Sequence, residues 1–417
     1  MRAHLLLAGL LLGASATAHA MDLRGSFSTM LAGRQDPRSG DTVSVIPAYE
    51  LVSLDANDLG VPGLDQSRLV LNAWGRWQFG KDELHDTAAD LNLVYFEARK
   101  KFFRMRLGRQ HLVLGVGRMD LIDGLDARVD VGPGIAVEAF AGFTVHPELH
   151  LRTDSWEGGG RLSYNLEAFN RVGELGVSYL QRREDGELFR NDVGADLHTL
   201  VGPARLAALA VMDPEAVALV EGRINAGFAP CTCLHVNLDV ERVAPGLMVP
   251  LNSIFSVFAD APHDAVGAGV AWAVSPFWSV SADGAGLMLD QSYLGYRAVL
   301  SAATYRDAEH RSAIGAELRR LREDDNGYLR GRLYTYLQVS EPIRIGADLY
   351  AIRFDDKINA FDRSLIGQAS ASYDITRSIR LAATVAGGQT PWAKSQVEGM
   401  LRFAYGYNVD FGREVAP

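Results

Sequence analysis

Residues 234–241 read Leu-His-Val-Asn-Leu-Asp-Val-Glu, so each apolar residue is followed by a polar one. Side chains alternate between the two faces of a β-strand, and this stretch therefore predicts a strand with one apolar and one polar face. The same alternation recurs at residues 161–168 and 343–350. Turn-forming pairs, among them Asp185-Gly186 and Glu341-Pro342, separate the alternating runs. The pattern predicts an all-β chain along almost its whole length.

The alternating runs amount to about 22 candidate strands of roughly 9 to 14 residues, lengths that suit strands crossing a bilayer. They begin near Asp22, Val43, Arg68, Leu91, Phe102, Gly134, Gly160, Gly173, Leu188, Ala204, Glu215, Cys231, Ser253, Ala265, Phe277, Tyr293, Ser312, Tyr328, Ile343, Ser364, Ser378 and Lys394. No linker, composition break or short-period repeat divides the chain. We therefore expect residues 21–417 to form a single antiparallel up-and-down transmembrane β-barrel of about 18 to 22 strands.

The spacing of the connections predicts which end of the barrel each one occupies. With both termini in the periplasm, every second connection should be a short periplasmic turn. The strand order above places at that end Lys100-Lys101, Asp185-Gly186, Asp213-Pro214, Ser275-Pro276, Glu341-Pro342 and Thr376. Long external loops are expected at residues 111–133 and 355–363. The intervals 144–159 and 243–252 are longer than periplasmic turns should be, which leaves the strand number open by one pair.

One alternating run is ambiguous. Residues 204–220 are rich in alanine and fit either a helix or a hairpin, although Asp213-Pro214 in the middle favours the hairpin.

The N-terminal residues predict export. A short basic segment with Arg2 and His4 precedes an apolar run from Leu5 to Gly13, and Ala18-His19-Ala20 fits a signal-peptidase site. We expect residues 1–20 to be a signal peptide cleaved after Ala20. No later stretch approaches the ~18 apolar residues of a spanning helix.

The charge balance excludes one class of partner. The chain carries a formal net charge of −10, which argues against nucleic acid, whose phosphates require a basic surface. Of the 41 basic residues only five are lysines. This bias fits either the base composition of the genome or arginines lining a polar surface that holds anions.

A segment near residue 110 resembles a known family. The sequence contains Arg106-Leu107-Gly108-Arg109-Gln110, then Gly115-Val116-Gly117-Arg118, then Asp123-Gly124-Leu125. This pattern resembles Gram-negative outer-membrane porin-like barrels, including alginate-export-type proteins. The resemblance implies an outer-membrane barrel with a polar lumen, and it implies no particular solute. Such barrels usually end on an aromatic residue that the assembly machinery reads, a part that Phe411 or Tyr407 would take here.

Arginines on predicted polar strand faces are the candidate pore-lining residues. We expect the solute to contact Arg104, Arg106, Arg109, Arg330, Arg332 and Arg344. The first three lead into the predicted loop 111–133, and a loop of that length is uncommon unless it is functional. If it folds inward, it narrows the pore. Charges of both signs in such a lumen set its ionic preference, although many of them pair only to solvate the interior.

The sequence points away from catalysis. No histidine lies in an HExxH, CxxCH or GxSxG context, so we expect no catalytic residues, no metal site and no cofactor. The only two cysteines are Cys231 and Cys233, with His235 two residues further on. On an extended strand these three side chains would span about 13 Å, too far for one metal ion. A disulfide between the cysteines would close a small, strained ring. Two interpretations of the pair remain open: they are simply small residues at the start of a strand, or they have a redox role.

Three functions follow from a barrel of this size. The first is a channel for small hydrophilic or charged solutes. The second is a structural barrel that holds a partner, and the third is a barrel-embedded hydrolase. A wall of about 18 to 22 strands encloses more lumen than side chains fill, which favours the first two. The expected partners are the outer-membrane lipid bilayer, the barrel-assembly machinery and a small solute.

Overall fold

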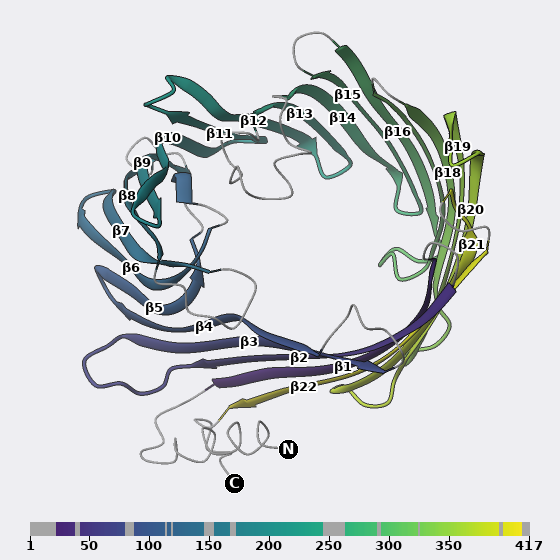
Figure 1. Cartoon of the computed structure of the whole chain (residues 1–417), viewed down its shortest axis with the longest axis horizontal. Helices are drawn as coiled ribbons and strands as arrows, with labels where there is room; N and C mark the ends of the chain where they lie inside the picture. The colour runs from purple at the N-terminus through teal and green to yellow at the C-terminus, as the bar shows by residue number, and fades with distance from the viewer. Residues whose placement is uncertain are drawn as a thin grey trace.

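The computed structural model of the chain is a ring of strands (Figure 1). It describes residues 22–37, 42–79, 87–112, 115–117, 120–145, 154–166, 172–244, 263–289, 293–323, 326–391 and 395–410. The strands are β1 (Asp22–Pro37), β2 (Thr42–Asn57), β3 (Gln66–Phe79), β4 (Ala88–Lys100), β5 (Phe103–His111), β6 (Leu121–Gly132), β7 (Ile135–Thr144), β8 (Ser155–Asn165), β9 (Val172–Glu184), β10 (Glu187–Val201), β11 (Ala204–Asp213), β12 (Ala218–Cys231), β13 (Leu234–Val243), β14 (His263–Ser275), β15 (Trp278–Leu289), β16 (Tyr293–Tyr305), β17 (Ala313–Arg322), β18 (Gly327–Gln338), β19 (Ile343–Ile358), β20 (Phe361–Asp374), β21 (Ile379–Gln389) and β22 (Gln396–Asp410). One short 3-10 helix, η1 (Gly115–Gly117), lies between β5 and β6. No helix in the described ranges is long and apolar enough to cross a membrane.

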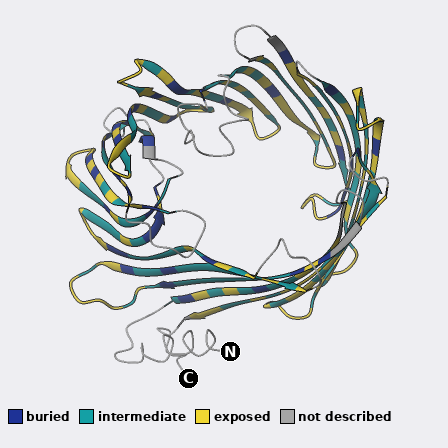
Figure 2. Cartoon of the chain, viewed as in Figure 1, coloured by how far each residue is buried: buried dark blue, intermediate teal, exposed yellow. Residues whose placement is uncertain are grey.

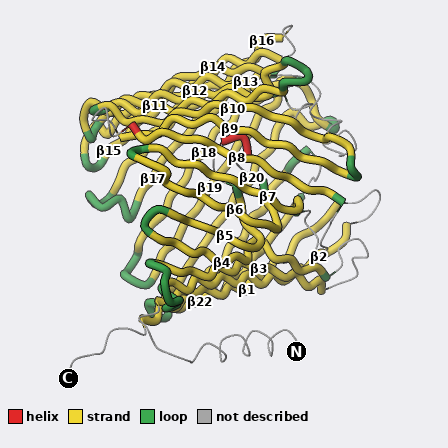
Figure 3. The backbone as a smooth tube through the Cα atoms, turned by 90° about the vertical axis from the view of Figure 1, so that its left-hand side faces the viewer, coloured by secondary structure: helices red, strands yellow, loops and turns green. Residues whose placement is uncertain are grey.

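The strands form one closed antiparallel barrel. Each strand pairs with the next in sequence, and β22 pairs with β1 from Leu23–Val409 to Arg34–Glu398. The side view shows the strands running obliquely around the wall (Figure 3). Closure leaves no unpaired strand edge, which a bilayer could not solvate. The prediction of a single antiparallel barrel is confirmed, with 22 strands at the upper end of the expected range.

The outer face of the wall is apolar. Along β19, Ile345 and Leu349 are exposed, whereas the residue before each of them, Arg344 and Asp348, is on the other face and is partly covered. The same banding runs along the strands in Figure 2. Leu333 on β18 and Leu401 on β22 are both 60% exposed. So many exposed apolar side chains on one face are explained by lipid contact, and the fold is that of a membrane-spanning barrel.

Aromatic side chains mark both borders of this apolar face. Trp272 on β14 and Trp278 on β15 are exposed beside the turn that joins those strands. Trp77 and Phe79 are exposed where β3 finishes, at the opposite end of the barrel. Amphipathic and aromatic rings gather at the membrane–water interface, so these residues bracket the bilayer-spanning part of the wall.

The number of strands is right, but two members of the predicted set differ. Residues 121–132 form strand β6, so the expected long loop 111–133 is wrong. The strand expected from Ser253 falls on residues 245–262, outside the described residues. Gly124 on β6 explains the first difference: a Cβ there would lie 2.2 Å from the carbonyl oxygen of Ala141. Asp123-Gly124 has the composition of a turn, but its glycine lies inside a strand and allows the backbones of β6 and β7 to approach closely.

The extra strand reverses the expected ends of several connections. Asp185-Gly186 and the turn at residues 214–217 follow the odd strands β9 and β11, so they lie opposite the end where β1 begins. The intervals 144–159 and 243–252 move to that same far end, where long loops are normal. The connections at residues 101–102, 276–277, 339–342 and 375–378 keep their expected end. The anomaly in loop lengths thus came from the missed strand.

Two remaining expectations concern β11 to β13. Residues 204–220 form a hairpin, as Asp213-Pro214 indicated. Cys231 and Cys233 form a disulfide, with 5.2 Å between their Cα atoms. The pairing is geometrically possible because Cys231 ends β12 and Cys233 lies in the turn, so the backbone bends instead of staying extended.

Candidate functional site: the charged inner wall

Strand pairing carries charged side chains to the inner face of the barrel. Arg106 on β5 lies opposite Glu97 on β4 and Asp126 on β6. The next residues on those strands, Leu107 and Leu125, are exposed on the outer face. Because cross-strand partners share a face, the rows of arginine and acid face the lumen.

Two of the predicted pore-lining residues lie together on β5. Arg106 donates to Glu97 (Nε–Oε2 2.7 Å), and its guanidinium lies 5.7 Å from the ring of Tyr95. Arg104 contacts Asp126 at 3.4 Å and Glu138 at 3.3 Å. Both side chains are mostly covered, at 17% exposure. They stabilise the wall and present little free surface to a solute.

Arg109 is buried. Its guanidinium forms a two-point contact with Asp123 (2.9 and 2.8 Å) and also donates to Asp90 and to the carbonyl of Leu91. Its side chain is 8% exposed. Arg109 therefore links β4, β5 and β6. It differs from Arg104 and Arg106 because its side chain is buried and has almost no surface for a solute to contact.

The ion-pair network continues beyond β5. Arg128 on β6 contacts Glu138 and Glu174, and Arg161 on β8 contacts Glu174 and Asp196. Acids outnumber arginines on the inner faces of β4 to β10, and we call this region the acid-rich wall. Its acids on the described residues are Asp90, Glu97, Asp126, Asp130, Glu138, Glu157, Glu174, Glu184, Asp192 and Asp196, and its arginines are Arg99, Arg104, Arg106, Arg128, Arg161, Arg182 and Arg190.

The other predicted arginines lie on β18 and β19. Arg330 contacts Glu317 at 2.5 Å, Arg332 contacts Asp348 at 2.5 Å and Arg344 contacts Asp374 at 3.1 Å. Their side chains are 23%, 31% and 42% exposed, more than Arg104 and Arg106. On the inner faces of β15 to β21, arginines outnumber acids, and we call this region the arginine-rich wall. Its charged residues are Arg297, Arg319, Arg330, Arg332, Arg344 and Arg380, with Asp283, Glu317, Asp348 and Asp374.

Tyrosines interleave the arginine-rich wall. The Arg332 guanidinium lies 4.7 Å from the ring centre of Tyr334 and 5.3 Å from that of Tyr350. Such stacking orients a guanidinium while leaving donors free, because one carboxylate does not use all five N–H groups. The arginine-rich wall thus offers cationic and aromatic surface together.

The two walls face each other across the lumen. In a ring of 22 strands, β7 and β18 are eleven positions apart, which is half the circumference. Figure 1 shows β4–β10 and β16–β21 on opposite sides of the ring. An excess of acid on one side and of arginine on the other produces a field across the lumen.

The segment Gly115–Gly117, which is part of the motif described in the sequence, packs against the acid-rich wall. The amide of Val116, in η1, donates to the Ser178 hydroxyl at 3.1 Å, and Arg190 donates to the Val116 carbonyl at 3.3 Å. The Val116 side chain is 1% exposed and packs with Leu180 and Val211. Residues 115–117, in the short connection between β5 and β6, therefore lie on the inner side of the wall; the sequence had left open whether the predicted loop folds inward.

Glycines make room for this inward segment. A Cβ at Gly194 on β10 would lie 2.4 Å from the Val116 Cγ1 atom, and one at Gly115, whose φ is +63°, would lie 2.6 Å from the Ser178 hydroxyl. Glycines inside strands are a sequence signal for such close approach. At the end of the segment, burial raises the pKa of the Asp120 carboxyl, and the contact with Arg190 opposes that rise.

Comparisons of the sequence with family models and with curated proteins found no significant match. The described residues also contain no cluster of three or more His, Cys, Asp or Glu side chains suited to a metal ion.

Three solved structures with similar folds are distant from this chain in sequence. The Pseudomonas aeruginosa protein OccK3 (OpdO) has a TM-score of 0.47 and 11% identity, covering 93% of this chain and 96% of that one. The P pilus usher (PapC) translocation pore has a TM-score of 0.47 and 10% identity, covering 93% and 100%. P. aeruginosa OpdK, solved with vanillate, has a TM-score of 0.42 and 9% identity, covering 93% and 99%. This chain is a closed, 22-stranded antiparallel β-barrel whose apolar outer face is that of a membrane-spanning barrel.

Proposed function

We propose that the chain is a channel that conducts small hydrophilic or charged solutes across the outer membrane of a Gram-negative bacterium. The observation that carries this proposal is the closed ring of 22 strands, apolar outside and charged inside. A ring of this size encloses more space than its own side chains fill.

The solute-contacting residues in this proposal are chiefly on the arginine-rich wall. Arg330, Arg332 and Arg344 are more exposed than Arg104 and Arg106, whereas Arg109 is buried. Opposed walls let a polar solute align its charges across the field as it moves. The inward segment at Val116 narrows the path from the acid-rich side, which brings passing solutes toward the arginine-rich side.

Membrane insertion would follow export and assembly. Residues 1–20 would direct the chain across the inner membrane, and the barrel-assembly machinery would insert it. Tyr407 lies on β22, where it is placed to serve as the terminal aromatic; Phe411 lies outside the described residues.

The test is single-channel conductance of the refolded protein in a planar bilayer. We expect discrete, stable steps, and a shift of the reversal potential toward cation preference when Arg330→Gln and Arg332→Gln are combined. The matched control is Arg104→Gln with Arg106→Gln, which removes the same charge from less exposed positions and should shift selectivity less. A folded barrel without conductance would contradict the proposal and favour a partner-holding barrel.

A further inference from the structure

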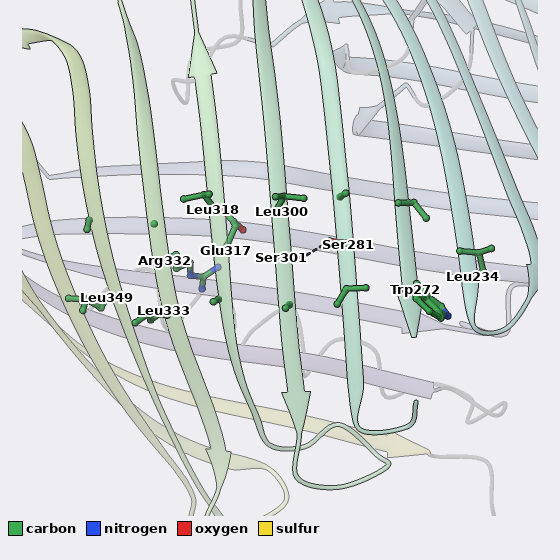
Figure 4. Close-up of a pocket in the computed structure, with 17 residues that line it drawn as sticks. Leu234, Trp272, Ser281, Leu300, Ser301, Glu317, Leu318, Arg332, Leu333 and Leu349 are labelled. Carbon is green, nitrogen blue, oxygen red and sulfur yellow. Dashed lines mark hydrogen bonds between the residues drawn. The ribbon is translucent and has the colours of Figure 1, made fainter. Parts of the chain in front are cut away.

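The outer face of the barrel carries a hollow that the channel does not use. It measures about 830 Å³ and lies over β13 to β19, with Leu300, Leu318, Leu333 and Leu349 on neighbouring strands (Figure 4). These leucines are among the exposed apolar side chains of the lipid-facing wall. Ala302, Ala316, Gly331 and Ala351 also line the hollow. Small residues between large ones give this part of the wall a recess that can take apolar chains.

A group of arginines lies next to the hollow on the same outer face. Arg320 on β17 pairs with Leu329 on β18, which pairs with Arg353 on β19. Leu329 is exposed on the lipid-facing side, so the two arginines flank it on that side. Arg320 is two residues from Leu318 along β17, which places the group directly beyond the hollow.

These arginines line a second hollow, of about 460 Å³, with Arg322, Phe354 and Asp355. We call it the arginine pocket. It lies where β17 ends and β18 begins, which is the end opposite the start of β1. Loop lengths and the N-terminal export signal assign this end to the outside of the cell.

Asp355 organises the arginine pocket without neutralising it. Its carboxylate receives two contacts from Arg320 (2.7 and 2.6 Å) and one from Arg322 (3.3 Å). Gly327 leaves room for this carboxylate, because a Cβ there would lie 2.5 Å from Oδ2. One carboxylate therefore holds two arginines in place. Arg353, paired in register with Arg363 on β20, adds further positive charge.

The described strand ends around the pocket carry acids as well as arginines, namely Asp355, Asp356, Asp362 and Glu323 beside Arg320, Arg322, Arg353 and Arg363. Asp362 contacts Arg363 at 3.6 Å, and both side chains are more than half exposed. Glu323 begins the turn after β17 and is exposed. Within the described residues of these strand ends, the arginines keep donors that the carboxylates do not use.

We propose that the arginine pocket and the outer hollow together bind a phosphorylated, multiply acylated glycolipid of the external leaflet. Guanidinium groups bind phosphate through paired, charge-assisted hydrogen bonds, and the pocket lies at the strand ends, beyond the apolar hollow, where a lipid headgroup would meet it. The hollow lies toward the middle of the bilayer from it, where acyl chains run. A water-soluble anion would bind in the arginine pocket and leave the apolar hollow empty. Binding of a protein partner would not explain why a cationic pocket lies directly beside an apolar hollow on the lipid-facing wall.

This inference rests on the proposed outer-membrane location and is independent of conduction. Arg320 and Arg322 on β17 and Arg353 on β19 are on the outer face, whereas Arg330 and Arg332 on the intervening strand β18 face the lumen. Loss of lipid binding with normal conductance would therefore refute only the lipid site. Loss of conductance with normal lipid binding would refute only the channel.

The test is native mass spectrometry of the folded full-length barrel in detergent, titrated with bis-phosphorylated lipid A or with its dephosphorylated form. We expect the phosphorylated lipid to bind at least tenfold more tightly. Combining Arg322→Gln with Arg353→Gln should remove most of this preference. Arg330→Gln is the matched control, because it removes one arginine from the inner face next to Leu329 and should leave binding unchanged.

A second variant tests the acyl-chain part of the site. Gly331→Phe fills the hollow without a steric clash, since a Cβ at Gly331 meets no heavy atom within 4 Å. We expect it to weaken lipid A binding several-fold while the phosphate preference persists. Equal binding of the phosphorylated and dephosphorylated lipids by the wild type would overturn the proposal, as would equal losses in Arg330→Gln and the double variant. Unchanged binding in Gly331→Phe would overturn the role of the hollow.

Discussion

Gly194→Ala should detach the inward segment from the acid-rich wall. The added methyl group would lie 2.4 Å from the Val116 Cγ1 atom, whereas unstrained carbon atoms are separated by about 3.5 to 4.0 Å. The strand backbone is fixed on both sides by pairing with β9 and β11, so the segment at Val116 must move instead. Movement of this size separates the Val116 amide from the Ser178 hydroxyl.

The magnitude follows from what holds the segment. Burial of the Val116 side chain contributes roughly 1.5 to 2 kcal/mol. Its hydrogen bonds with Ser178 and Arg190 contribute about 1 kcal/mol each. Ordering the backbone of the segment offsets part of this sum, and about 3 kcal/mol remains as an upper value. That free energy corresponds to roughly a hundredfold change in the equilibrium between attached and detached segments.

The assay is hydrogen exchange at the Val116 amide, measured in the folded barrel. We expect protection to fall by up to a hundredfold in Gly194→Ala, with unsteady conductance because the freed segment moves in the lumen. Gly284→Ala is the control, since the nearest atom to its added carbon is the Arg297 oxygen at 3.7 Å. Unchanged protection at Val116 in the Gly194 variant would refute the reasoning.

Three further changes test the wall, the disulfide and the orientation. Arg161→Ala should lower the free energy of unfolding by about 3 to 5 kcal/mol in a urea titration, because it removes the arginine partner of Asp196 in a buried network and leaves Glu174 only its contact with Arg128. Arg380→Ala, at a half-exposed pair, should cost under about 1 kcal/mol, and equal losses in the two variants would contradict this. Replacing Cys231 and Cys233 by alanine should leave the unfolding midpoint nearly unchanged, because the disulfide encloses only Thr232; a large drop would show a structural role. In that cysteine-free protein, an impermeant maleimide should label Glu187→Cys in intact cells and should not label Pro203→Cys, whereas the reverse pattern would invert the barrel.

Alternation was sufficient to predict which face most of the regularly alternating strand residues occupy. Residues 234–241 form most of β13, and their polar members lie on the inner face. The same rule placed Arg104, Arg106, Arg330, Arg332 and Arg344 on the inner wall. It works because the period of a strand is two and the bilayer fixes which face is apolar.

Tertiary contacts decided what alternation could not. Asp123-Gly124 has turn chemistry, yet Gly124 is required by the nearby Ala141 carbonyl in the middle of a strand pair. Arg109 follows Gly108, whose φ is +123°, and it is buried by contacts with Asp90 and Asp123. Neither the close approach nor the burial can be deduced from the neighbouring residues alone. Gly115 and Gly194 were the available signals for the inward segment, but only the barrel brings them together.

Closure of the barrel, more than any single motif, sets the geometry of the lumen. The acid-rich wall faces the arginine-rich wall because β7 and β18 are half a circumference apart in a ring of 22 strands. In a ring of 18 strands, β18 would adjoin β1 and β16 would lie opposite β7, so Arg330 and Arg332 on β18 would no longer face the middle of the acid-rich wall. The missed strand β6 therefore affected more than a loop assignment, since it reversed the ends assigned to connections as far as β13. The field across the pore is a consequence of strand number and order, which the local sequence determines only when every strand is identified.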